Sequence, residues 1–186
     1  SSSFENLFSH LRILNKKSSF NSISPSKLIE NERRRKKKIL ILMSDTGGGH
    51  RASAEAIELA LAEIFPNRIE VEIVDLWTAF APYPFNTFVT SYRFLAKHPT
   101  LWRAFYMYGR FPVTKVMTEL WSRTTCYNTF KRAIERSNPD LIVSVHPLCQ
   151  HIPIPIVKKM NKMRKSHQKP ISFVTVVTDL GGAHVT

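Results

Sequence analysis

The sequence has little cysteine, glycine or acidic side chain, and it lacks a long uninterrupted apolar run. Its two cysteines, Cys126 and Cys149, form no CxxC pair, so we expect reduced, buried thiols and no disulfide framework. No window of 18 residues is both apolar and uncharged, so the sequence predicts no membrane-spanning helix. The 14 acidic residues stand against 27 Lys and Arg, and the resulting formal net charge of +13 favours anionic partners.

Several binding motifs are also missing. No helix-turn-helix, zinc-finger or aromatic RNA-binding signature accompanies the positive charge, which therefore favours an anionic membrane surface over nucleic acid. His146, Cys149 and His151 have a spacing that matches no standard zinc pattern, so we predict no metal site. The P-loop motif and the dinucleotide fingerprint GxGxxG are absent as well.

The first 38 residues differ in character from the rest. They are crowded with serine and carry ten Lys or Arg against three acidic residues, ending in the basic block 33–38. We interpret residues 1–38 as a disordered linker or the end of a transit peptide. The basic block is either a solvated charge run or a contact with an anionic membrane. Residues 39–186 form the predicted folded domain.

The most informative stretch is residues 39–57, where an apolar run gives way to three glycines, a histidine and a helical pattern. Residues 39–43 are typical of a strand buried on both faces, and a helix is predicted from Arg51. Gly47, Gly48 and Gly49 allow positive φ and a close approach to an anion at the helix start. The same positive helix end disfavours a charged His50, and a neutral imidazole can accept a proton. A tight structural turn and a structural histidine stay open as alternatives.

Three further strands are predicted at residues 69–76, 141–145 and 171–178, separated by helical stretches. This alternation predicts an α/β fold, a Rossmann-like, doubly wound parallel sheet. Ligands bind beyond the carboxyl ends of such strands. His50, Trp77, His146 and Asp179 all follow strand ends, so we expect them to share one cleft. A packing role for Trp77 and a helix-capping role for Asp179 are the plainer alternatives.

A long insertion is predicted between the second and third strands, at residues 80–137. It holds 14 of the 20 aromatic residues and nine Lys or Arg against two Glu. Aromatic side chains mixed with basic ones are typical of segments that lie at lipid headgroups. We expect about half of these rings to pack between helices and sheet and the remainder to meet lipid. Pro82 and Pro84 mark a stiff corner at its start, for which a plain loop is the alternative.

Several segments together resemble the plant and algal monogalactosyldiacylglycerol synthases. The resemblance covers about residues 38 to 184 and rests on SDTGGGHRASAEAI (44–57), DLWTAFAPYPFN (75–86), SYRFLAKHPTLW (91–102), PDLIVSVHPLCQHIP (139–153) and FVTVVTDL (173–180). It implies the N-terminal, acceptor-binding domain of a two-domain GT-B glycosyltransferase, with an aromatic and basic helical insertion. Because the C-terminal donor domain would be absent, we expect the 186-residue chain alone to be inactive.

The resemblance also implies a reaction. Galactose passes from UDP-galactose to the hydroxyl of diacylglycerol with inversion, with His50 as general base and UDP-galactose as substrate rather than cofactor. Gly47, Gly48 and Gly49 would make room for the donor phosphates, and Pro84 would lie on the acceptor and anionic-lipid side. We assign three further residues to that side: Trp77, Tyr83 and His146. The implied location is the plastid (chloroplast) envelope membrane, as a peripheral protein.

Two other classes of function remain open. Related diacylglycerol glucosyltransferases and enzymes that glycosylate lipid precursors carry shorter glycine and histidine loops. A non-catalytic peripheral membrane module that binds lipid would explain the insertion alone. His50 separates the classes, because a module that only binds lipid does not need a proton-accepting histidine beside a glycine loop.

Overall fold

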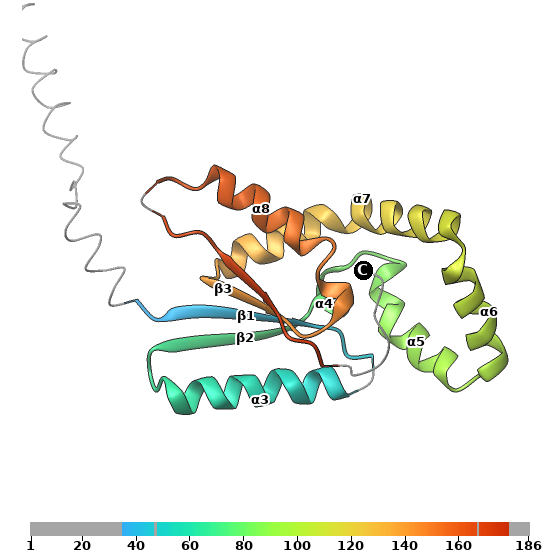
Figure 1. Ribbon diagram of the computed structural model, residues 1–186, viewed down its shortest axis with the longest axis horizontal. Helices are drawn as coiled ribbons and strands as arrows, with labels where there is room; N and C mark the ends of the chain where they lie inside the picture. Colours follow the sequence, from blue (N-terminus) through green and yellow to red (C-terminus); the bar gives the residue numbers. More distant parts are fainter. Residues whose placement is uncertain (1–34, 47, 167, 179–186) are drawn as a thin grey trace, which may run out of the picture. The chain divides into compact units, whose positions relative to one another are not determined.

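A four-stranded parallel sheet forms the centre of the computed structural model, which describes residues 35–46, 48–166 and 168–178 (Figure 1). The strands are β1 (Lys37–Met43), β2 (Ile69–Asp75), β3 (Leu141–Ser144) and β4 (Ser172–Thr175), in the order β2-β1-β3-β4. All three strand pairings are parallel. The predicted fold class, an α/β domain built on a parallel sheet, is confirmed.

Helices cover both faces of this sheet. Helix α3 (Gly49–Ile64) lies on one face, and α7 (Pro112–Ser137) and α8 (Pro153–Met163) lie on the other (Figure 1). Because successive side chains of a strand point to opposite faces, β1 serves two cores. Ile39, Ile41 and Met43 belong to the core that includes Ala54 of α3, whereas Leu40 and Leu42 belong to the core that includes Phe130 of α7.

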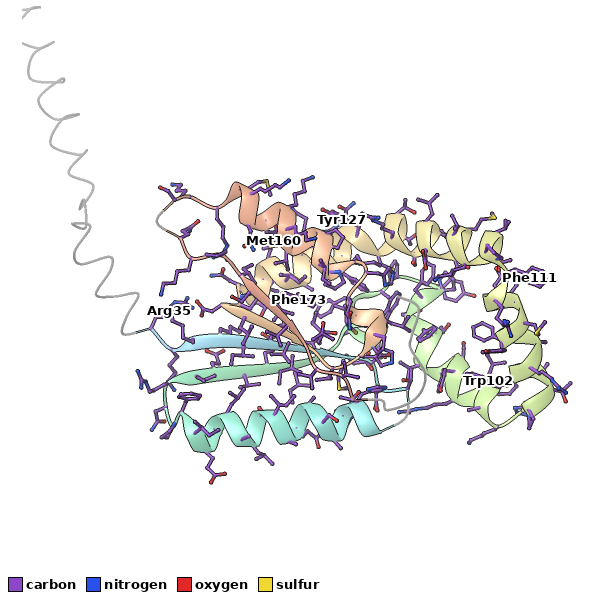
Figure 2. All side chains as sticks on the ribbon, in the orientation of Figure 1. Arg35, Trp102, Phe111, Tyr127, Met160 and Phe173 are labelled. Carbon is purple, nitrogen blue, oxygen red and sulfur yellow. The ribbon has the colours of Figure 1, made fainter. Side chains whose placement is uncertain are left out.

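The insertion between β2 and β3 is helical, as predicted. It consists of α4 (Leu76–Phe80), the 3-10 turn η1 (Phe85–Thr87), α5 (Phe88–Ala96), α6 (Pro99–Arg110) and α7; a second 3-10 turn, η2 (Pro147–Cys149), follows β3. Trp102 and Phe111 lie far from the sheet, whereas Tyr127 and Met160 lie close to it and Phe173 is on β4 itself (Figure 2). Seven of the fourteen aromatic residues are exposed, which matches the expected division between packing and surface rings.

The C-terminal part of the insertion packs onto the sheet. Cys126, Phe130 and Ile134 on the second half of α7 are fully buried and belong to the core of the sheet domain. This half of α7 is the connection that packs back onto the sheet before β3 begins. Phe80, Ala81 and Phe85 at the start of the insertion also contact this core, so the segment that extends beyond it runs from about residue 88 to residue 121.

The bounds of several elements also differ from the prediction. Strand β1 begins at Lys37 rather than residue 39, and Lys38 pairs with Glu72 on β2 at 3.0 Å. Helix α3 begins at Gly49, which places His50 inside its first turn. Strands β3 and β4 end at Ser144 and Thr175, because side chains occupy the next carbonyl of β3, as described below.

The two thiols are free and buried, as expected. Burial raises the pKa of Cys126 to about 11. Burial, with a smaller contribution from Asp75, raises the pKa of Cys149 well above its usual range. In the part of the chain that the structure describes, no helix has both the length and the apolar character needed to cross a bilayer.

Candidate functional site

Polar side chains gather at the carboxyl edge of the sheet. Thr46 follows β1, His146 follows β3 and Thr178 follows β4, while His50 lies in the first turn of the helix after β1. The two histidines are 9% and 8% exposed, so nearly all of each imidazole is withdrawn from water. Buried polar groups of this kind need defined hydrogen-bond partners.

The hydrogen bonds of His50 fix its tautomer. Its Nδ1 lies 3.0 Å from the carbonyl oxygen of Val145 and 2.9 Å from Oγ1 of Thr178. A carbonyl oxygen only accepts, so Nδ1 must carry the hydrogen and donate it. In the neutral ring the lone pair is therefore on Nε2. This is the form of histidine that can accept a proton at Nε2.

His146 is held in the opposite tautomer. The backbone N–H of Leu148 donates to Nδ1 of His146 at 3.1 Å, so this nitrogen carries the lone pair. Its Nε2 then carries the hydrogen and donates to Oγ1 of Thr46 at 3.2 Å. Pro147, directly after His146, begins η2, and this turn brings the Leu148 N–H back onto the ring.

The two imidazoles contact each other. Their ring centroids are 4.3 Å apart and their planes are inclined by 68°, an edge-to-face arrangement. Two imidazolium ions at this separation would repel each other strongly in a site with little water. The contact therefore places two imidazoles of opposite tautomer side by side at the edge of the sheet.

The glycine loop leaves the start of α3 open. Gly48 is the N-cap residue, with φ of +75°, the left-handed region that favours glycine. Among the described residues no side chain caps this helix, and its first turn has no acidic residue. A Cβ added at Gly48 or Gly49 would meet no atom within 4 Å among the described residues. The first N–H groups of α3 are thus suited to an anion. Gly47 lies outside the described residues.

Two arginines meet at the carboxylate of Asp45, beside this loop. Arg51 of α3 lies 3.2 Å from it, and Arg93 of α5 lies 3.1 Å from it and also donates to the Asp45 carbonyl at 2.8 Å. Arg93 is in the insertion, so this cluster links the insertion to the histidine loop. Each pair is partly exposed and contributes at most about 1 kcal/mol.

The residues assigned to the acceptor side lie in different surroundings. Tyr83 is 79% exposed, whereas Pro84 lines a small apolar pocket of about 220 Å³ with Phe85, Phe88, Tyr92 and Phe105. Trp77 is buried and its ring contacts Phe85, Phe88, Phe130 and His151. Of the four residues expected to share a cleft, His50 and His146 meet directly, and Asp179 lies outside the described residues.

Trp77 and His151 form a second polar feature in this region. Their rings stack with centroids 6.2 Å apart, and neither Trp77 Nε1 nor His151 Nε2 has a hydrogen-bond partner among the described residues. Burial lowers the pKa of His151, the charge of Arg123 lowers it further, and Glu119 opposes both. A neutral His151 is therefore favoured at this position.

Thr46, Thr178 and the carbonyl of Val145 were not predicted as site groups. Each of them directly follows a strand or lies within three residues of its end, so the rule that located the histidines applies to them equally. Threonines and backbone carbonyls are too common to stand out without knowledge of which strands are neighbours. In the described part of the chain, no cluster of three or more His, Cys, Asp or Glu side chains is placed to hold a metal ion.

The fold and this edge define a Rossmann-like α/β domain with a buried histidine pair at the position where such domains bind ligands. Residues 50–186 match the model of the family described as monogalactosyldiacylglycerol (MGDG) synthase. The chain belongs to the monogalactosyldiacylglycerol synthase family.

Individual relatives agree with this assignment. The chain is 44% identical over 142 residues to the chloroplastic monogalactosyldiacylglycerol synthase 1 of Arabidopsis thaliana, covering 76% of this chain and 26% of that protein. It is 43% identical over 143 residues to the chloroplastic synthase of Spinacia oleracea, with the same coverage of 76% and 26%. The chain therefore spans about a quarter of the length of the relatives that it matches.

Proposed function

We propose that the full-length protein transfers galactose from UDP-galactose to the free hydroxyl of diacylglycerol, with His50 as the general base. Family membership and the names of the relatives support the galactosyl transfer to this lipid. The observation that carries the role of His50 is its hydrogen bond to the Val145 carbonyl, because this bond leaves the lone pair of the neutral ring on Nε2.

The proposed reaction is a single displacement. The acceptor hydroxyl oxygen attacks the anomeric carbon of galactose, and its proton passes to Nε2 of His50 as the new C–O bond forms. The bond between the anomeric carbon and the phosphate oxygen breaks on the opposite side, so UDP leaves and the configuration is inverted. His146 stays neutral beside the His50 imidazolium. The Val145 carbonyl and the Thr178 hydroxyl accept the hydrogen bond from the Nδ1–H of His50.

In this proposal the described domain is the acceptor half of a GT-B enzyme. The open start of α3, with Gly48 at positive φ and no capping side chain, supports an approach of the donor phosphates to Gly48 and Gly49. Most contacts to UDP-galactose belong to the C-terminal domain of such an enzyme. No cofactor or metal enters the scheme, and UDP-galactose is its second substrate.

The acceptor reaches the site from a membrane surface. We define the apolar tip as the exposed apolar residues on α6 and the first half of α7: Leu101, Phe105, Tyr106, Met107, Tyr108, Phe111, Val113, Val116, Met117, Leu120 and Trp121. Arg103, Arg110 and Lys115 lie among them, a mixture that suits anionic headgroups. The relatives are named as chloroplastic, which supports a plastid location, with peripheral attachment to the envelope.

The test of the general base is His50→Ala in the full-length protein. Galactosyl transfer from UDP-galactose should fall by at least about 100-fold, the usual contribution of a positioned base. Vesicle binding should stay unchanged, since it does not depend on proton transfer. The unfolding midpoint should fall, because the truncation removes a buried ring and its hydrogen bonds, so the assay is run well below the midpoint of the variant. Turnover within a few-fold of the unaltered protein would refute the assignment. Assaying UDP-glucose in parallel tests the alternative donor.

A further inference from the structure

The hydroxyl of Thr178 makes two contacts beside Nδ1 of His50. Its Oγ1 lies 2.9 Å from His50 Nδ1 and 3.1 Å from the carbonyl oxygen of Val145, which itself lies 3.0 Å from the same Nδ1. These three atoms form a closed triangle of hydrogen-bonding groups. Thr178 reaches it from the segment that follows β4, whereas His50 lies more than a hundred residues earlier.

The direction of each hydrogen bond follows from the carbonyl. The Val145 oxygen has no hydrogen to give, so the Thr178 hydroxyl donates to it and keeps its lone pairs for another partner. The His50 Nδ1–H then donates to both oxygens, in a bifurcated bond. Two acceptors on one N–H select the tautomer with hydrogen on Nδ1 and also fix the plane of the ring. The Val145 carbonyl alone already favours hydrogen on Nδ1, and the Thr178 hydroxyl adds a second acceptor that strengthens this preference.

We propose that Thr178 is a positioning residue for His50. Its hydroxyl completes the acceptor pair that keeps the hydrogen on Nδ1 and the lone pair on Nε2, both before and after Nε2 takes up a proton. This inference rests on the proposed role of His50 as the general base. Thr178 does not touch the reacting atoms, so its effect is on the orientation and tautomer of the base rather than on substrate binding.

The tautomer can be read directly in the 186-residue chain, without turnover. Long-range ¹H–¹⁵N spectra of the imidazoles distinguish a ring protonated at Nδ1 from one protonated at Nε2. In the unaltered chain His50 should be the Nδ1–H tautomer. Thr178→Ala, which removes the hydroxyl without adding bulk, should raise the fraction of Nε2–H, and Thr178→Ser should restore the original spectrum. Thr175→Ala, at an exposed threonine of β4, is the matched control and should have no effect.

The second readout is activity of the full-length protein. Thr178→Ala should lower kcat about tenfold, the scale of one lost hydrogen bond, with KM for diacylglycerol nearly unchanged. Thr178→Ser should keep kcat within about twofold. An unchanged His50 spectrum in Thr178→Ala, or a serine variant as impaired as the alanine variant, would overturn the proposal.

The two readouts separate this inference from the proposed function. If His50→Ala still turns over normally while Thr178→Ala shifts the tautomer, the base assignment fails and the positioning contact stands. If His50→Ala is inactive and Thr178→Ala changes neither spectrum nor kcat, the base assignment stands and the positioning role fails.

Discussion

The two halves of helix α7 have opposite surroundings although they belong to one continuous element. In the second half Cys126, Phe130 and Ile134 are fully buried against the sheet. In the first half Val113, Val116, Met117, Leu120 and Trp121 are all more than half exposed. Each half has an apolar surface, but only the second half buries it in the core of the described domain.

This difference shows that apolar residues on one helix serve two separate purposes. The buried half completes the core that supports the edge carrying His50 and His146. The exposed half joins α6 in the apolar tip, which costs free energy in water unless a partner covers it. Stability and membrane binding should therefore depend on different halves of the same helix.

The largest expected effect comes from the buried half. Phe130→Ala should lower the free energy of unfolding by about 3–5 kcal/mol, because it removes a large side chain from a closed core and leaves a cavity. Denaturant titration of the 186-residue chain measures this loss. Phe111→Ala, at an exposed phenylalanine of the apolar tip, is the matched control and should change stability by less than about 0.5 kcal/mol. Equal losses in both variants would contradict the division of the helix.

The exposed half should determine membrane binding. The double variant Met117→Ser and Leu120→Ser should bind vesicles of mixed galactolipid and anionic phospholipid at least about tenfold more weakly, since two apolar side chains no longer enter the bilayer interface. Cosedimentation across a lipid titration measures the affinity. The unfolding free energy should stay nearly unchanged.

Leu59 provides the control for this experiment. It is 71% exposed but lies on α3, outside the apolar tip, so Leu59→Ser should bind vesicles normally. Vesicles without anionic lipid should bind the unaltered protein and Leu59→Ser less well, because the basic residues of the tip then lose their anionic partners. If Leu59→Ser binds vesicles as weakly as the double variant, the apolar tip is not the membrane-binding surface.

The fold was largely predictable from the sequence because its strands are strongly apolar and separated by helical patterns. Residues 39–43 can form little other than a buried strand, and the observed β1 contains them. The exposed and buried halves of α7 could not be distinguished in this way, because Val116 and Phe130 are both apolar residues in one helical pattern. Only the path of the chain decides which of them reaches the sheet.

The location of the site at the carboxyl edge of the sheet was predictable from the sequence, but the contacts within the site were not. His50 and His146 follow strands that pair with each other, so their proximity follows from the parallel fold. The bond between His50 Nδ1 and Thr178 Oγ1 depends on where the chain turns after β4, which no local pattern specifies. The roles of Trp77, Tyr83 and Pro84 stay predictions.

The smallest expected effect concerns the junction between the two halves of α7. Glu119 and Arg123 lie on either side of this junction, and both act on His151, whose pKa is lowered mainly by burial. Below the usual histidine pKa of 6.5 the unfolded chain binds a proton at this position that the folded chain does not. Stability should therefore decrease as the pH falls from about 7 to 5.

His151→Phe keeps a ring against Trp77 and removes the titrating group. Its free energy of unfolding should depend less steeply on pH over the same range than that of the unaltered chain. Arg123→Ala should lie between the two, because it removes one of the groups that lower the pKa of His151. Denaturant titrations at pH 7, 6 and 5 compare the three proteins. If His151→Phe loses stability on acidification as steeply as the unaltered chain, the titration of His151 is not the source of the pH dependence.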